Sequence, residues 1–318
     1  MSELSLLGQQ ARFPTGLSDL GGGLYAWLQP NGGLGESNAG LVVGEGESLL
    51  IDTLWDTRLT RRMLDAMAEH TAATPIRRLV NTHGDPDHCW GNQLLAGAEI
   101  IATRATEEDM RGEDPRRLRL LALGGRLLPG GLSAFARLLR PYDFSGIRVT
   151  PPTRTFEGVL ELDVGGRRVE LIEVGPAHTP GDLIVHVPDE RVVFAGDLLF
   201  VGVTPIMWVG PVENWLAGLD RIVELGPRAV VPGHGPVSDV DGVRTMRSYW
   251  EFVVRAVREG QTAREIFRRL PEPFAGWDNP ERIAVNAAIV ARGGGPRVPE
   301  RVRMRLLGEM GELARSRR

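Results

Sequence analysis

The sequence contains no lysine, so all 37 of its lysine-plus-arginine positions are arginine. A chain without lysine cannot form a Schiff base, carry a lysine-linked cofactor or bind phosphate through the lysine of a phosphate loop. These classes of enzyme are therefore excluded.

Cysteine is almost absent as well, since Cys89 is the only one. One cysteine cannot form an internal disulfide, which favours a reducing compartment. The opening residues lack a basic segment followed by an apolar one, and no apolar run approaches the roughly 18 residues of a membrane span. The formal net charge of −4 gives no basic face for nucleic acid. We therefore expect a cytoplasmic protein that binds neither membrane nor nucleic acid.

What the chain does have is enough apolar sequence for a large core, 42% of 318 residues. Apolar runs predict strands within 24–52 and at Ile76–Val80, and the stripe in 57–70 predicts a helix. Paired apolar runs on either side of Gly165-Gly166 predict a hairpin. Strands that alternate with helices indicate an α/β layered architecture.

Two stretches have a helical pattern. The first is 104–142, where Asp114 followed by Pro115 is typical of a helix start. The second runs from 243 to the end, and its arginine-rich part after residue 297 predicts a solvated helix. No composition shift marks a boundary, so we predict a single domain over 1–318.

Four of the six histidines lie in loops that directly follow strand-like runs. Side chains mounted on loops at strand ends commonly form binding sites. His83 and His88 share the segment His-Gly-Asp-Pro-Asp-His with two aspartates. Because the carboxylates of Asp85 and Asp87 would repel each other and be costly to bury, a cation that holds them together explains the segment best.

The segment resembles the first motif of the metallo-β-lactamase superfamily, His-x-His-x-Asp-His. Later landmarks of that family are also present in order, namely His178 after a Gly-rich turn, Gly196-Asp197 after a strand, and Gly233-His234. The resemblance covers about residues 24–240. It implies a four-layer αβ/βα sandwich, here with a helical insertion at about 104–142 and a helical C-terminal extension at about 243–318.

The resemblance also implies a role for each position. His83, Asp85 and His178 would bind a first metal ion. Asp87, His88 and His234 would bind a second, with Asp197 bridging the two. Two divalent ions held in this way, zinc first and iron or manganese otherwise, would supply a bridging hydroxide that attacks a carbonyl group. Asp87 would also help to orient that nucleophile.

The departure from the family pattern is Asp85, where the family usually has histidine. An aspartate adds negative charge and a harder oxygen ligand to the first site. Either the site tolerates the change and favours manganese or iron, or the first metal binds weakly and one-metal chemistry results.

Other residues are candidates for supporting roles. Met207 and Trp208 follow Asp197 closely and are predicted, with Tyr142, to contact substrate. The leucines of 104–142 either line an apolar substrate pocket or only seat the helices. Asp52 either braces the metal loops or caps the next helix. His70, His186 and Cys89 are expected to be structural, and Trp90 and Asn92 to pack the ligand loop.

The leading functional hypothesis is a hydrolase for a small ester, thioester, lactone or lactam. Glyoxalase II-like thioesterases and polyketide-pathway thioesterases or cyclases are similar in sequence. An alternative within the fold is an oxidoreductase like the persulfide dioxygenases, with one iron held by His83, His178 and Asp197. A non-catalytic binding protein is a third class, which the nearly complete ligand set argues against. The sequence predicts neither the substrate nor the oligomeric state.

Overall fold

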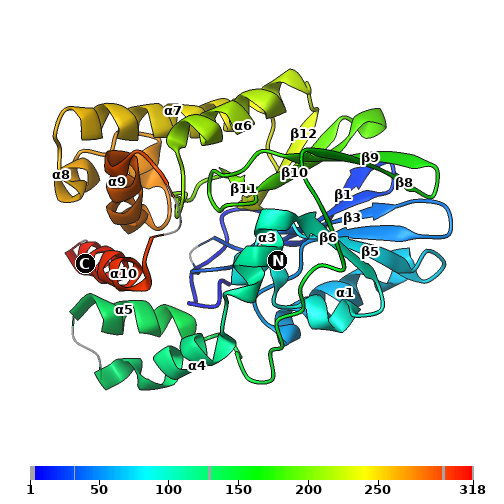
Figure 1. Cartoon of the computed structure of the whole chain (residues 1–318), viewed down its shortest axis with the longest axis horizontal. Helices are drawn as coiled ribbons and strands as arrows, with labels where there is room; N and C mark the ends of the chain where they lie inside the picture. The colour runs from blue at the N-terminus through cyan, green and yellow to red at the C-terminus, as the bar shows by residue number, and fades with distance from the viewer. Residues whose placement is uncertain (1–3, 32, 128–129, 296–297, 317–318) are drawn as a thin grey trace.

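Two β-sheets packed face to face, with helices on their outer faces, form the centre of the computed structural model (Figure 1). The structure describes residues 4–31, 33–127, 130–295 and 298–316. The first sheet has the strand order β1-β2-β3-β4-β5-β6-β7. Its strands are β1 (Gly16–Gly21), β2 (Leu24–Leu28), β3 (Ala39–Val43), β4 (Ser48–Ile51), β5 (Ile76–Val80), β6 (Glu99–Thr103) and β7 (Arg154–Phe156).

The second sheet has the order β12-β11-β10-β9-β8. Its strands are β8 (Val159–Val164), β9 (Arg167–Glu173), β10 (Leu183–Val187), β11 (Val192–Phe200) and β12 (Ala229–His234). The helices are α1 (Thr57–Thr71), α2 (Pro86–Cys89), α3 (Arg104–Arg111), α4 (Pro115–Gly124), α5 (Gly130–Leu139), α6 (Val212–Glu224), α7 (Val240–Arg258), α8 (Ala263–Arg268), α9 (Ile283–Arg292) and α10 (Glu300–Ser316).

The strand side chains alternate between two cores. In β4, Leu49 and Ile51 join the core between the sheets, whereas Leu50 joins the core beneath the helices. The same alternation separates Leu79 from Val80 in β5. Because successive side chains of a strand point to opposite faces, a strand that is apolar throughout is buried on both sides. This pattern produces the four-layer sandwich.

The parallel strand pairs place several strand ends at one edge. β4 pairs in parallel with β5, and β11 with β12. The loops that follow β4 and β5 therefore emerge on the same side, and so do the ends of β11 and β12. This edge carries the histidine loops.

Many sequence-based predictions are confirmed. The helix expected at 57–70 is α1, the strand expected at Ile76–Val80 is β5, and the Gly165-Gly166 hairpin joins β8 to β9. One expectation is wrong in detail: Gly196-Asp197 does not follow a strand but lies inside β11. Gly196 has φ +50°, and the pairing with β12 shifts register there, so the strand continues past an irregularity.

The prediction of a solvated C-terminal helix is wrong for one face of α10. Leu306, Leu307, Met310 and Leu313 are buried, whereas Arg301 and Arg305 are exposed. The buried face packs on α5 and α9, and α10 lies between these two helices in Figure 1. The inserted segment and the C-terminal segment therefore meet, although they are distant in the sequence.

Glycines allow α5 and α10 to approach closely. A Cβ atom on Gly131 would lie 1.9 Å from the carbonyl oxygen of Gly308, and one on Gly311 would lie 2.3 Å from the carbonyl oxygen of Gly131. Backbone atoms cannot move aside as a flexible side chain can, so Gly131 and Gly311 fix the distance between the helices.

No helix within the described ranges is both long and apolar enough to cross a bilayer.

Candidate metal centre

The seven predicted ligands converge on one point at the edge of the two sheets. His83, Asp85, Asp87 and His88 come from the loop after β5 and from α2, and His178 comes from the turn between β9 and β10. Asp197 lies in β11, and His234 ends β12. The ligand atoms form three groups, and the atoms within each group lie within 4.8 Å of one another. The groups are His83, Asp85 and His178; Asp87, His88 and His234; and His83, His88 and Asp197.

Each of the four imidazoles has its Nδ1 atom bonded to the surrounding protein. Nδ1 of His178 donates to the carbonyl oxygen of Ile206 at 2.6 Å, and Nδ1 of His234 donates to that of Glu36 at 3.2 Å. Nδ1 of His83 lies 3.0 Å from the hydroxyl of Thr82. A proton on Nδ1 leaves the lone pair on Nε2, so these bonds fix the tautomer that a metal ion requires.

Asp52 provides the same support for His88. Its Oδ2 atom lies 3.0 Å from Nδ1 of His88, and it accepts a hydrogen bond from the hydroxyl of Thr82 at 2.6 Å. Its Oδ1 atom accepts from the backbone N–H of Thr82 at 2.7 Å. The N-cap of α1 is Asp56 instead. Of the two roles considered for Asp52, the structure therefore shows the brace for the ligand loop.

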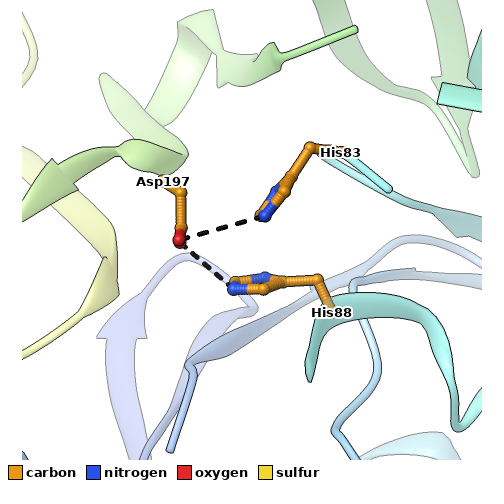
Figure 2. Close-up of side chains that lie close together, drawn as sticks. All are labelled: His83, His88 and Asp197. Carbon is orange, nitrogen blue, oxygen red and sulfur yellow. Dashed lines mark ion pairs between the residues drawn. The ribbon is translucent and has the colours of Figure 1, made fainter. Parts of the chain in front are cut away.

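Asp197 occupies the middle of the centre. Its Oδ1 atom lies 3.1 Å from Nε2 of His88, and its Oδ2 atom lies 3.4 Å from Nε2 of both His178 and His234. Figure 2 shows Asp197 pointing between His83 and His88. Nε2 of His83 lies 3.9 Å from Oδ2 of Asp197. Gly233 makes this position possible, because a Cβ atom there would lie 1.9 Å from Oδ1 of Asp197.

Burial and the neighbouring charges have opposite effects on the pKa values of the centre. Burial disfavours the charged form of His178, but its bond to Asp85 and the charge of Asp197 outweigh burial and raise its pKa to about 9. Burial also acts to raise the pKa of Asp197, but His234 and His88 outweigh it and hold that pKa well below the usual range. Burial lowers the pKa of His83. Neutral His83 and ionised Asp197 are the forms that bind metals.

The donor set fits a bound cation. Nε2 of His83, Nε2 of His88 and Oδ1 of Asp197 are buried, and none forms a hydrogen bond of regular geometry in the described part of the chain, although the last two atoms are 3.1 Å apart. Buried polar atoms normally have hydrogen-bond partners, and exceptions that share one space are suited to hold a metal ion. Imidazole and carboxylate donors at this separation are typical of divalent metal ions.

A cavity opens above the centre, with about 660 Å³ of space that includes its open mouth. Its polar floor contains Asp85, Asp87, Asp197 and His234. Its walls are mainly apolar and come from the inserted helices, α10 and the loop after β11. The apolar lining residues are Leu34, Trp55, Pro86, Leu118, Phe135, Leu139, Phe200, Ile206, Trp208, Leu307 and Met310.

The three predicted substrate contacts have different positions. Trp208 lines the cavity. Tyr142 is one layer behind the wall, where its ring contacts Trp55 at 4.4 Å and its hydroxyl accepts from the N–H of Gly35. Met207 is fully buried and is not among the lining residues. The inserted helices supply part of the wall through Leu118, although Leu120 and Leu123 of the same helix are exposed.

Two arginines in the cavity wall, Arg282 and Arg303, were not predicted. They belong to the region after the core motifs, where the sequence shows only a helical pattern. Spacing along a helix cannot show which neighbour it packs against, so no local signal identifies them.

The residues expected to be structural lie outside the ligand cluster. His70 stacks on Tyr25 with ring centroids 4.1 Å apart, and His186 pairs with Glu170 at 2.8 Å within the second sheet. Cys89 is buried, and burial raises the pKa of its thiol well above the usual range. Trp90 is buried, and Asn92 bonds to the ligand loop through Asn81.

Comparison with known proteins identifies the family. The profile of the metallo-beta-lactamase superfamily matches residues 32–234. The chain belongs to this superfamily. The metallo-beta-lactamase match includes all seven predicted ligands and ends at His234, so α7 to α10 lie beyond it.

Similarity to curated relatives is low. The chain is 25% identical over 210 residues to the 2,4-dinitroanisole O-demethylase subunit alpha of Nocardioides sp. (strain JS1661), which covers 61% of this chain and 51% of that protein. The chain thus spans about half the length of this relative. It is 24% identical over 234 residues to an acyl-coenzyme A thioesterase of Bos taurus, and this match covers 68% of this chain and 79% of that protein.

Solved structures agree on the fold. A metallo-beta-lactamase family protein from Thermus thermophilus has a TM-score of 0.61 at 22% identity, covering 87% of this chain and 98% of that one. The sec-alkylsulfatase from Pseudomonas sp. has a TM-score of 0.63 at 18% identity, and the match covers 87% of this chain and 50% of that one.

Proposed function

We propose that this protein is a metal-dependent hydrolase that cleaves a small carbonyl ester or thioester, or a lactone or lactam. The observation that carries the proposal is the position of Asp197 between two separate three-residue groups. His83, Asp85 and His178 would hold one divalent metal ion, and Asp87, His88 and His234 would hold the other. The similarity to an acyl-coenzyme A thioesterase supports a thioester or ester substrate.

Bound divalent metal ions would lower the pKa of a coordinated water and polarise the carbonyl oxygen of a substrate. The protein contributes the other parts of the reaction. The apolar walls of the cavity exclude water and orient the substrate. The carboxylate of Asp87, on the floor of the cavity, would take a proton from the attacking water and return it to the leaving group. Water thus adds across the ester, thioester or amide bond to give an acid and an alcohol, thiol or amine.

Asp85 bears on the identity of the metal. Its Oδ2 atom lies 3.1 Å from Nε2 of His178, which supports Asp85 as a ligand of the first metal ion. A third carboxylate favours harder ions, and zinc would compete with manganese or iron. Metal analysis of protein purified without added metal, followed by reconstitution with each ion, tests both the number and the identity.

The functional test is a hydrolysis panel of p-nitrophenyl esters, acyl thioesters, lactones and β-lactams. His88→Ala should abolish turnover and lower the metal content, whereas His70→Ala, which removes a histidine outside the site, should leave both unchanged. Turnover by metal-free protein, or by His88→Ala, would show that the assigned centre is wrong.

A second candidate is hydrolysis of an electron-poor aryl ether. It is favoured by the similarity to the 2,4-dinitroanisole O-demethylase subunit and by the aromatic walls Trp55, Phe135 and Trp208. Adding 2,4-dinitroanisole to the panel separates the two candidates. The single-iron oxidoreductase would instead show one iron per chain and oxygen consumption, and it leaves the group of Asp87, His88 and His234 without a use.

A further inference from the structure

Arg282 is a buried cation in the wall of the metal-centre cavity. Its exposed fraction is only 3%, yet it is one of the residues that line the cavity. Burial lowers the pKa of Arg282, and the charges of Glu281, Asp197 and Asp87 oppose this change. A guanidinium is therefore held beside the proposed reaction site in a region of low dielectric, where its field is strong.

Neutral groups hold Arg282 in place. NH1 donates to the carbonyl oxygen of Thr204 at 2.9 Å, and NH2 donates to that of Leu34 at 3.0 Å. Its Cζ atom lies 5.9 Å from the ring centroid of Phe200, which in turn stacks on His234 with centroids 5.0 Å apart. These contacts fix the orientation of the guanidinium, but they use only part of its N–H donors and provide no anion for its charge.

Arg282 has no carboxylate partner within ion-pair distance in the described ranges. Arg303, the other arginine of the cavity, differs because it pairs with Glu113 at 3.7 Å and lies over the ring of Trp208 at 5.0 Å. Burying a charge without a partner is costly, so such charges usually serve a ligand. If the proposed function is correct, bound metal ions neutralise Asp87 and Asp197, and Glu281, whose charge also acts on Arg282, is not among the residues that line the cavity.

We propose that Arg282 binds a carboxylate of the substrate, so that the cavity takes an acyl compound with an apolar body and an anionic end. This proposal rests on the proposed hydrolase function. The walls formed by Trp208, Phe135 and Leu307 would contact the apolar body while the reacting carbonyl lies over Asp197. Planar N–H donors of arginine match the two oxygens of a carboxylate.

The first test compares two esters of equal chain length in the metal-loaded enzyme. p-Nitrophenyl pentanoate ends in a methyl group, whereas p-nitrophenyl hydrogen glutarate ends in a carboxylate. We expect kcat/KM to be about tenfold or more higher for an anionic ester, since bonds to charged groups are the stronger ones. The succinate and adipate monoesters, with their neutral counterparts, extend the comparison to other lengths. No preference for the anionic ester at any length would overturn the proposal.

The second test assigns the preference to Arg282. Arg282→Gln should lower kcat/KM for the anionic ester much more than for the neutral ester, mainly through KM, so that the preference is lost. Arg282→Lys keeps the charge without the planar donors, so its preference for the anionic ester should lie between that of the wild type and that of Arg282→Gln. Arg305→Gln removes the same charge from an exposed position on α10 and should change nothing. A preference that persists in folded Arg282→Gln would contradict the proposal. If this variant does not fold, a preference in Arg282→Lys as large as that of the wild type would contradict it instead.

A binding measurement separates this proposal from the hydrolase function. The anilides of glutarate and pentanoate are poor substrates, and their binding is followed by tryptophan fluorescence, because Trp55 and Trp208 line the cavity. Tighter binding of the glutarate anilide to the wild type than to Arg282→Lys supports the carboxylate site even if no ester is hydrolysed. Equal binding of the two anilides to the wild type would refute it.

Discussion

Oδ2 of Asp52 lies 3.0 Å from Nδ1 of His88, and Asp52 holds this position with a φ of 62°. A non-glycine residue in this region carries strain, which persists only where the surrounding structure requires it. Here the surrounding structure is the pair of bonds to Thr82. The strained aspartate therefore links the end of β4 to the ligand loop after β5.

Asp52→Ala should weaken metal binding by about 10- to 100-fold, the usual effect of removing the partner of a ligating histidine. Competition with a chromophoric chelator measures the affinity. Asp56→Ala is the control, because Asp56 caps α1 through the N–H of Leu59 at 2.7 Å. That variant should lose about 1 kcal/mol of stability and keep its metal affinity. Equal affinities for wild type and Asp52→Ala would count against the brace.

Gly233→Ala should disturb the centre without touching a ligand directly. Its added methyl group would meet Oδ1 of Asp197 at 1.9 Å and displace the carboxylate. We expect less metal per chain in this variant, measured by atomic emission after dialysis. Gly97→Ala adds the same methyl group where no heavy atom lies within 4 Å, and it should bind metal normally. Full metal content in Gly233→Ala would show that Asp197 is not needed where it lies.

The crossing of α5 and α10 offers a matched pair of variants. Gly131→Ala places a methyl group against the backbone of Gly308 and should lower stability by about 1–3 kcal/mol. Gly308→Ala meets nothing within 4 Å and should raise stability by about 0.5–1 kcal/mol, since alanine favours a helix. Urea unfolding measures both. Opposite signs are the expected result, and two similar values would contradict the close approach of the helices.

Glu36 should make stability depend on pH. Burial raises the pKa of Glu36 to about 7, although the N–H groups of Leu6 and Gly33 oppose this rise. The folded protein therefore binds more protons than the unfolded chain between about pH 4 and 7, and stability falls as pH rises through that window. Glu36→Gln removes the ionisation and should unfold at a higher temperature than wild type at pH 8 but not at pH 4. A difference that does not change with pH would contradict this.

The sequence predicted which seven side chains converge, because they lie in short segments that follow apolar strands. His178 and His234 were identified by local pattern, and the parallel and antiparallel pairing then brought their loops together. The contribution of α10 to the cavity wall was not predicted, because it depends on which face of one helix meets another. Leu307 and Met310 of α10 read as part of a charged helix, and only their contact with α5 gives them a role in the cavity.

Adjacent residues can also point in different directions, which the sequence alone does not show. Trp208 faces the cavity, whereas the N–H of Met207 donates to the side chain of Asn286 and its own side chain is buried. Both residues follow Asp197 at nearly the same distance along the chain. The position of Met207 depends on its bond to α9, which lies far away in the sequence.

The helices α5 and α10 line the cavity above the centre, and neither supplies any of the seven predicted ligands. Natural variation in α5 and α10 can therefore alter which molecules enter while the chemistry below continues unchanged. The glycine crossing joins the two segments, so their sequences are expected to change in concert. Related proteins with the same seven ligands but different residues at this crossing should accept different compounds.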